Sequence, residues 1–246
     1  MAQVEQLRFP PITEAVIDFR VTGKSPVTQK DFEPIREALA KDYPIARNIF
    51  RGSEGFQFLP IGEVPPQNGI WGGINLASAD EKYFATFSPQ RCSVSRARPY
   101  QNWNHLKNEF LKLWDVYQHA LPSASLDQVG LRYFNELEVP VPEKISDIFK
   151  AGLAMAPAGF SLGGFASNCL INDLSRQAVA VLRVASQPPG ETGRIFRFMV
   201  DIDSTKQGPF DLEKTDSWSQ AMEDLRNFKN ELFFGLLTDY VITRFK

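Results

Sequence analysis

The stretch Ser125–Pro140, SLDQVGLRYFNELEVP, lies at the midpoint of the chain and decides the fold that we expect. Val129, Leu131 and Tyr133 alternate with polar or mixed positions, a period of two that is typical of a strand with one buried face. Pro140 cannot donate a backbone hydrogen bond, so strand pairing should end there. The sequence therefore predicts one long strand at the centre of the chain.

The same order of elements is predicted in each half of the chain: a strand, a helix, three strands and a helix. The first half has the strand Ala15–Val21, the helix Asp31–Lys41, the strands Gly55–Pro60, Ile70–Ala77 and Tyr83–Arg98, and a helix from Trp103 to about His119. The second half has the strand Val129–Val139, the helix Glu143–Leu153, the strands Phe160–Asn172, Gln177–Ser186 and Arg194–Asp203, and a helix from Trp218. We predict an α+β fold of duplicated β-α-β3-α units, with antiparallel sheets and helices packed on one face.

The predicted repeats span residues 1–124 and 125–246. Neither repeat has enough elements to cover both faces of its own sheet, so we expect them to form one cooperative body. Trp103 and Trp218 should each anchor a closing helix at its boundary with the sheet, one in each repeat.

Composition is that of a folded protein without a basic surface. Of 246 residues, 43% are hydrophobic and 23% are charged, which argues against extended disorder. The net charge is −2, and the basic excess that neutralises phosphates is missing. We therefore expect no duplex nucleic acid as a partner.

Cysteine usage and the start of the chain predict a cytoplasmic protein. Cys92 and Cys169 each lack a second cysteine nearby, so neither a zinc pattern nor a disulfide framework is present. The first residues lack a basic start followed by an apolar run, and no segment reaches about 18 consecutive apolar residues. A membrane location is therefore not expected.

No complete catalytic constellation is found. His105 and His119 are fourteen residues apart on one predicted helix, about 21 Å at a rise of roughly 1.5 Å per residue, and cannot share a metal ion. No Gly-x-Ser-x-Gly motif occurs, and the glycines of 159–164 lack the Lys-Ser/Thr ending of a phosphate loop, so they predict a turn. We expect no cofactor.

Arginines inside the predicted strands are the unusual feature. Arg rarely goes fully buried without a carboxylate, so these side chains either pair with Asp18, Glu136 and Asp201 in a structural network or line a groove for an anionic ligand. The network is the preferred interpretation, with Asp18 or Glu136 as the expected partner of Arg132. The candidate ligand-binding residues are Arg20, Arg132, Asn135, Arg183 and Arg197, and Arg96 also interrupts an apolar run.

Two carboxylates give the one metal hypothesis. Asp201 and Asp203 lie two residues apart on a predicted strand and so project from the same face. Such a pair could hold Mg²⁺ with further oxygen ligands from Asp18 or Glu136. The pair could equally mark the solvent end of a strand.

Two motifs carry a resemblance to a known family. Pro10, Pro11, Ile12, Glu14 and Ala15 form a Pro-Pro-Ile-x-Glu-Ala start, and the stretch Gly130–Asn135 forms a Gly-Leu-Arg-Tyr-x-Asn strand. With these motifs the chain resembles a sporadically distributed family of bacterial proteins, over nearly its whole length. The resemblance implies no particular activity. Glu136 stands where the family pattern has a basic residue, so a shared role based on charge does not follow.

The sequence favours the first of three functions, and the other two stay open as alternatives. The first is a non-catalytic binding or interaction protein, such as a regulator or neutralising partner of another protein, or a homo-oligomer. The second is an enzyme or binder that acts on a phosphorylated small molecule or nucleotide through an arginine-lined sheet face. The third is single-stranded nucleic-acid binding on an open sheet. Arginines gathered at an open cleft would favour the second, and arginines each paired with a carboxylate would favour the first.

Overall fold

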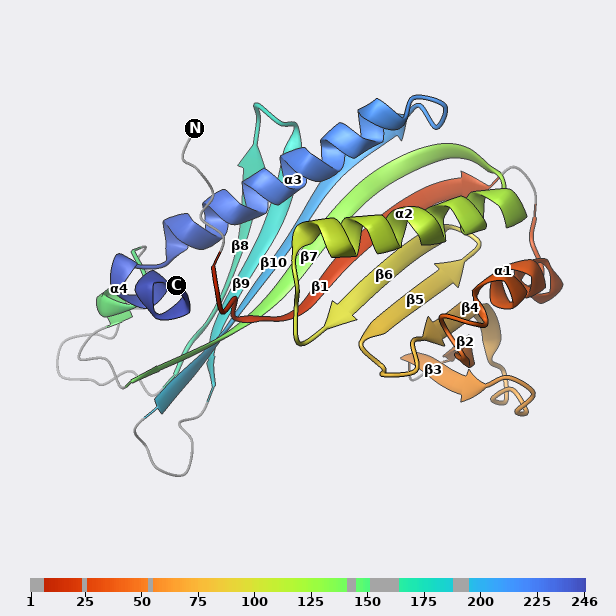
Figure 1. Ribbon diagram of the computed structural model, residues 1–246, viewed down its shortest axis with the longest axis horizontal. Coiled ribbons are helices and arrows are strands. Elements are labelled where there is room, and N and C mark those ends of the chain that lie inside the picture. The colour runs from red at the N-terminus through yellow and green to blue at the C-terminus, as the bar shows by residue number, and fades with distance from the viewer. Residues whose placement is uncertain (1–6, 24–25, 53–54, 141–144, 151–163, 188–194) are drawn as a thin grey trace. The chain divides into compact units, whose positions relative to one another are not determined.

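The computed structural model describes residues 7–23, 26–52, 55–140, 145–150, 164–187 and 195–246 (Figure 1). Its strands are β1 (Ile12–Gly23), β2 (Ile45–Gly52), β3 (Gly55–Pro60), β4 (Ile70–Ala77), β5 (Tyr83–Ser88), β6 (Arg91–Ala97), β7 (Ser123–Pro140), β8 (Ala166–Asp173), β9 (Ala178–Gln187) and β10 (Ile195–Phe210). Its α-helices are α1 (Glu33–Leu39), α2 (Trp103–Ala120), α3 (Thr215–Leu236) and α4 (Asp239–Ile242). Short 3-10 turns cover η1 (Gln29–Phe32), η2 (Ile145–Asp147) and η3 (Thr243–Phe245).

The ten strands form one sheet, in the order β3-β2-β4-β5-β6-β1-β7-β10-β9-β8. The prediction of duplicated β-α-β3-α units is therefore wrong. Five strands, β2 to β6, lie between α1 and α2 in place of the three predicted. The predicted helix Glu143–Leu153 lies partly outside the described residues, and its described part holds η2. The pairings whose register is described are all antiparallel, namely β3 with β2, β2 with β4, β4 with β5, β5 with β6, β10 with β9, and β9 with β8.

Two local features account for the extra strands. The predicted strand Tyr83–Arg98 is a hairpin, because the chain turns back at Pro89 and Gln90 between β5 and β6. Strand β2 was missed because Arg47, Asn48 and Arg51 interrupt its apolar residues. Period-two alternation continues across a tight turn, so periodicity alone does not show where one strand ends and the next begins.

The chain forms two compact units, and each is assembled from separate segments of the chain. Strands β1, β7 and β10 each have residues in both units. Unit 1 consists of residues 1–14, 130–206 and 219–246, and unit 2 consists of residues 15–129 and 207–218. Unit 1 holds an apolar cluster, and buried apolar residues of unit 2 include Phe19, Phe110 and Leu113.

In unit 1, α3 crosses one face of the sheet (Figure 1). Strand β9 alternates between buried and partly exposed residues along its length, and Leu182 and Val184 point to the buried side. They pack with Val200 and Ile202 of β10 and with Phe233 of α3. Each such side chain contributes roughly 1.5–3 kcal/mol when it is fully buried, so apolar packing is the main force that holds α3 on the sheet.

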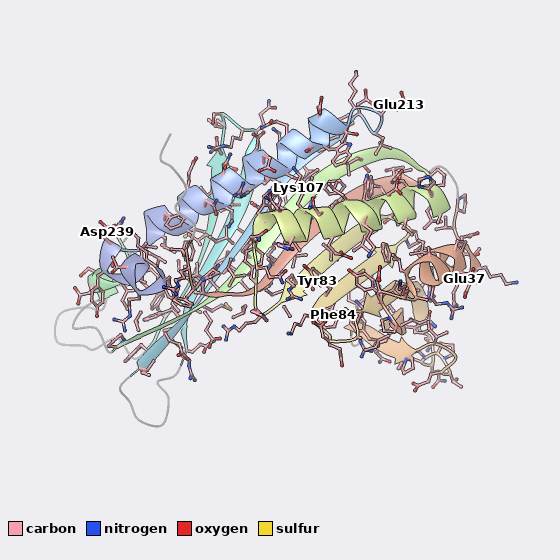
Figure 2. All side chains as sticks on the ribbon, in the orientation of Figure 1. Glu37, Tyr83, Phe84, Lys107, Glu213 and Asp239 are labelled. Atoms are coloured by element: carbon pink, nitrogen blue, oxygen red, sulfur yellow. The ribbon has the colours of Figure 1, made fainter. Side chains whose placement is uncertain are left out.

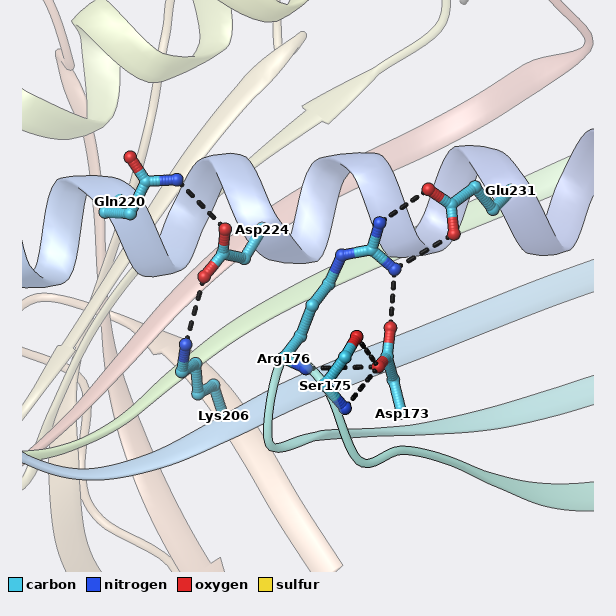
Figure 3. A network of polar contacts seen from close by, with 7 residues as sticks. All are labelled: Asp173, Ser175, Arg176, Lys206, Gln220, Asp224 and Glu231. Atoms are coloured by element: carbon cyan, nitrogen blue, oxygen red, sulfur yellow. Dashed lines mark hydrogen bonds and ion pairs between the residues drawn. The ribbon is translucent and has the colours of Figure 1, made fainter. Parts of the chain in front are cut away.

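Ion pairs join α3 to neighbouring elements at two points (Figure 3). Lys206 of β10 donates to Asp224 over 3.0 Å, and Arg176 in the turn after β8 donates to both oxygens of Glu231 over 2.9 and 2.6 Å. Arg176 also donates a hydrogen bond to the carboxylate of Asp173, the last residue of β8. Surface ion pairs are worth about 0–1 kcal/mol each, so they orient the helix rather than hold it.

In unit 2, α2 packs on β6 and its neighbours. Asn102 caps the helix, since its side-chain oxygen accepts a hydrogen bond from the backbone N–H of His105 over 3.0 Å. Helix α2 begins at Trp103, as predicted. The ring of Phe19 lies 4.5 Å from that of Phe110 and 5.7 Å from that of Trp218. Trp103 and Trp218 are both buried. Both belong to unit 2, whereas the prediction placed one in each of two separate repeats.

Candidate functional site

Arg132 and Arg183 meet on a single carboxylate in unit 1. Asp201 of β10 lies directly opposite Arg183 of β9 in the antiparallel register. Its oxygens accept hydrogen bonds from Arg132 Nε over 2.9 Å, from Arg132 Nη2 over 2.8 Å and from Arg183 Nη1 over 2.9 Å. The side chain of Asp201 is 2% exposed, and those of the two arginines are 38% and 36% exposed. Three strands thus bring two cations to one buried anion.

A second carboxylate completes the charge balance. Asp203 lies on the same face of β10, with an oxygen 4.0 Å from Arg132 Nε and 3.9 Å from Arg183 Nη1. The hydrogen bond to Asp201 raises the pKa of Arg132, and the nearby charges of Asp201 and Asp203 raise it further. The Arg132 guanidinium also lies 4.3 Å from the centre of the Phe134 ring. Two cations facing two carboxylates leave no excess positive charge to attract an anion.

The same pairing argues against a metal ion between Asp201 and Asp203. Both oxygens of Asp201 already accept N–H groups from arginine, and a cation there would have to displace them. Within the described ranges, no group of three or more His, Cys, Asp or Glu side chains is placed to hold a metal ion.

The other candidates in unit 1 lie apart from this cluster. Arg197 donates to Glu138 over 2.7 Å and lies 3.9 Å from Glu136. Asn135 is buried on the face opposite to Arg132, where its side chain donates to the backbone carbonyl of Val200 over 3.0 Å. Asn135 therefore joins two strands and is not part of an arginine-lined groove.

Arg20 belongs to unit 2, where it lines a hollow of about 730 Å³. Its guanidinium lies 3.7 Å from Asp18, which also accepts a hydrogen bond from Arg91. The polar side chains of the hollow bond one another: Thr22 donates to Asp127 over 2.7 Å, and Gln207 donates to Gln128 over 3.0 Å.

Arg96 is the remaining strand arginine, and it stacks on an aromatic ring. Its guanidinium carbon lies 4.5 Å from the centre of the Tyr83 ring. Tyr83 is the first residue of β5 and is labelled in Figure 2. Its Nε is buried and has no hydrogen-bond acceptor among the described residues. Each of the five arginines that the sequence singled out, namely Arg20, Arg96, Arg132, Arg183 and Arg197, is thus engaged by a carboxylate or by a ring.

The two histidines lie on α2, and the two cysteines lie on different strands, β6 and β8. His105 and His119 lie on one helix, α2, as predicted, and both are exposed. Cys92 is a free, buried cysteine, and burial raises the pKa of its thiol, so the reactive thiolate is disfavoured. Cys169 is also free.

An exposed apolar surface in unit 2 was missed in the sequence. Phe56 and Phe58 of β3 are 67% and 51% exposed, and Ile70 of β4 is 71% exposed. Arg51 of β2 pairs in register with both Phe56 and Ile70, so these three side chains lie in a row on one face. We call Phe56, Phe58, Arg51 and Ile70 the β3 surface. The available signal was the motif Phe-Gln-Phe in a short strand without charged residues, because it puts two rings on the same face.

Comparisons with known proteins give no family for this chain: no family model matches it, and no curated protein matches it in sequence. Among the described helices, none combines the length and hydrophobicity needed to span a bilayer.

Proposed function

We propose that this protein works by binding another protein through the β3 surface and carries out no chemistry of its own. The observation that carries the proposal is the exposure of Phe56 and Phe58 side by side on a terminal strand. Large apolar side chains grouped in the open mark interaction sites more often than single ones do. Aromatic residues are also enriched at the centres of protein interfaces.

The arginine cluster, formed by Arg132 and Arg183 with Asp201 and Asp203, supports the same proposal because it argues against an anion-binding site. An anion-binding site holds cations whose charge is met by the ligand. Here Asp201 and Asp203 already meet the charges of Arg132 and Arg183. A phosphorylated ligand would have to compete with a buried carboxylate that holds both arginines, so it would gain little by binding.

Affinity purification from the cells that produce the protein tests the proposal. We expect the wild-type protein to retain a protein partner, a second copy included, and Phe58→Asp to lose it. Leu174→Asp is the matched control, because Leu174 is 89% exposed but lies outside the β3 surface. Circular dichroism should show that both variants fold.

Two results would contradict the proposal. One is equal recovery of every partner by wild type and Phe58→Asp. The other is a thermal midpoint raised by a nucleotide or sugar phosphate in the wild type but not in Arg132→Ala, which would make the arginine cluster a ligand site.

A further inference from the structure

Strand β3 is the last strand at its end of the described sheet. On one side it pairs with β2 over its whole length, from Gly55 opposite Gly52 to Pro60 opposite Arg47. In the described strand order nothing follows it on the other side. A terminal strand presents a row of backbone N–H and C=O groups that can pair with another strand.

Natural sheet edges are commonly protected by charged side chains, by proline or by a bulge. Strand β3, with the sequence GFQFLP, carries no charged residue, and its proline stands at the end of the strand. Its first four residues, Gly55 to Phe58, are all exposed. As far as the described residues go, this edge is therefore open to pairing both in its backbone and in its side chains.

The sequence of β3 is also self-complementary. The motif Phe56-Gln57-Phe58 reads the same in both directions. If two antiparallel copies of β3 pair about Gln57, Phe56 lies opposite the partner's Phe58 and Gln57 lies opposite the partner's Gln57. Cross-strand aromatic pairs stabilise a sheet by roughly 0.2–1 kcal/mol each relative to alanine. Because the strand is neutral, the pairing brings no like charges together.

We infer that a second copy of this chain pairs with the free edge of β3, antiparallel about a two-fold axis at Gln57, and so contacts Phe56 and Phe58 of the β3 surface. The inference rests on the proposed function and names its partner. Closed two-fold symmetry is the commonest arrangement of homo-oligomers, and it requires one surface to fit itself. The Phe56-Gln57-Phe58 motif meets that requirement at the centre of the strand.

The charges around the strand are compatible with this dimer. Arg51 lies on β2, one strand in from the edge. In the dimer three strand spacings would separate it from the partner's Arg51, at least about 14 Å. At physiological salt the screening length is about 8 Å, so this repulsion is weak.

The size of the contact sets the expected affinity. A single six-residue strand from each copy buries less than the roughly 1,200–2,000 Å² of a stable interface. We therefore expect a dimer with a Kd of about 1–100 µM, at the weak end of specific association.

A charge-swap experiment at Gln57 tests the inference. Gln57 is exposed, so Gln57→Glu and Gln57→Lys should both leave the monomer folded. In the dimer each variant places two like charges directly opposite each other, which destabilises cross-strand pairs. We expect each variant alone to sediment as a monomer at concentrations where the wild type is dimeric. An equimolar mixture should dimerise again, because Glu then faces Lys.

Sedimentation equilibrium of the wild type, both variants and their mixture separates the outcomes. A wild type that stays monomeric up to about 500 µM, well above the expected Kd, would overturn the inference. So would a dimer that both variants retain, or a mixture that stays monomeric. Recovery of a different protein in a manner that depends on Phe58 would keep the proposed function while the self-pairing fails.

Discussion

Asp201 is the residue on which the role of Arg132 depends. It is buried, and the described hydrogen bonds to its side chain all come from the two arginines. Removing one partner of such a group costs more than the pair itself contributes, because the other partner is left without compensation. This asymmetry lets a stability measurement distinguish a structural pair from a ligand site.

We predict that Arg132→Ala lowers the free energy of unfolding by about 1–3 kcal/mol, a range that allows for the partial exposure of Arg132. The variant loses two of the three hydrogen bonds to Asp201. Arg183→Ala loses one and keeps the two-bond contact, so it should cost about 0.5–1.5 kcal/mol. Urea unfolding of both variants at neutral pH measures the difference. An Arg132→Ala protein as stable as the wild type would show that this arginine is not a structural partner.

The sequence predicted a network of arginines and carboxylates but not which arginine pairs with which carboxylate. Charge and burial rules predicted that arginines inside strands need carboxylates. Asp18 or Glu136 was the partner expected for Arg132, and that prediction is wrong, because Asp201 holds it. The two residues are 69 positions apart, and only the order of strands in the sheet brings them together.

Lys229 is a second residue whose behaviour follows from its surroundings. Its ammonium lies 3.9 Å from the centre of the Tyr133 ring, and no described carboxylate pairs with it. Burial lowers the pKa of Lys229 to about 7, and the positive charge of Arg226 lowers it further. An unfolded lysine has a pKa of about 10.4. Between these two values the unfolded chain binds a proton that the folded chain does not, so stability rises with pH.

We predict that Lys229→Met is more stable than the wild type by about 1–3 kcal/mol at pH 6, where the folded protein must hold the charge. The attraction of the ammonium to Tyr133 offsets part of the gain. The difference should shrink towards zero near pH 10, because there the folded wild type holds a neutral amine. Denaturant unfolding between pH 6 and 10 measures it, with Lys30→Met as the exposed control. A constant difference at every pH would exclude titration of Lys229 as the cause.

At the scale of elements, strand β4 depends on one glycine. Gly73 has a φ of +148° and lies where the pairing of β2 with β4 shifts register. A Cβ at this position would lie 2.1 Å from the carbonyl oxygen of Phe87 on β5, which is backbone and cannot swing away. The neighbouring Gly72 has room, because its nearest atom would be 3.7 Å away.

We predict that Gly73→Ala lowers the free energy of unfolding by at least about 2 kcal/mol, since both the backbone conformation and the space oppose a side chain. Gly72→Ala is the matched control and should change stability by less than about 1 kcal/mol. Thermal or urea unfolding compares the two. Equal effects at both positions would mean that β4 can move away from β5.

The long helices were the elements that the sequence predicted best. The three- and four-residue spacing from Trp103 to Tyr117 places these apolar residues on one side of α2, and six of them are buried. Strands were harder to predict than helices, because the alternation of apolar and polar residues continues across a tight turn and hides where one strand ends and the next begins. The edge position of β3 was not predicted either, since a strand at an edge and a strand at the centre differ in their neighbours more than in their own residues.

At the scale of the whole molecule, the two halves of the sequence do not correspond to the two units of the structure. The repeated order of elements suggested a boundary after residue 124. Each compact unit instead takes segments from both sides of that position. A repeated order of elements reflects local patterns in the sequence, whereas the compact units depend on the pairing of strands that are far apart in the sequence.

Unit composition therefore gives a physical reason why the fragments 1–124 and 125–246 should not fold separately. The first fragment lacks Trp218, whose ring lies 5.7 Å from that of Phe19 in the core of unit 2. The second lacks Pro11, whose carbonyl accepts a hydrogen bond from the backbone N–H of Glu136 over 2.9 Å in unit 1. Each fragment would leave an apolar face and strand edges without their partners.

We predict that neither purified fragment shows a cooperative thermal transition, whereas the full chain cut after Ala124 keeps one as long as its two pieces remain together. A protease site inserted at that position gives the cut form, which controls for the broken peptide bond itself. Calorimetry and near-UV circular dichroism follow both samples. Two sharp, independent transitions from the separate fragments would show that each half holds a complete core, and that the segments shared between the units add little to either.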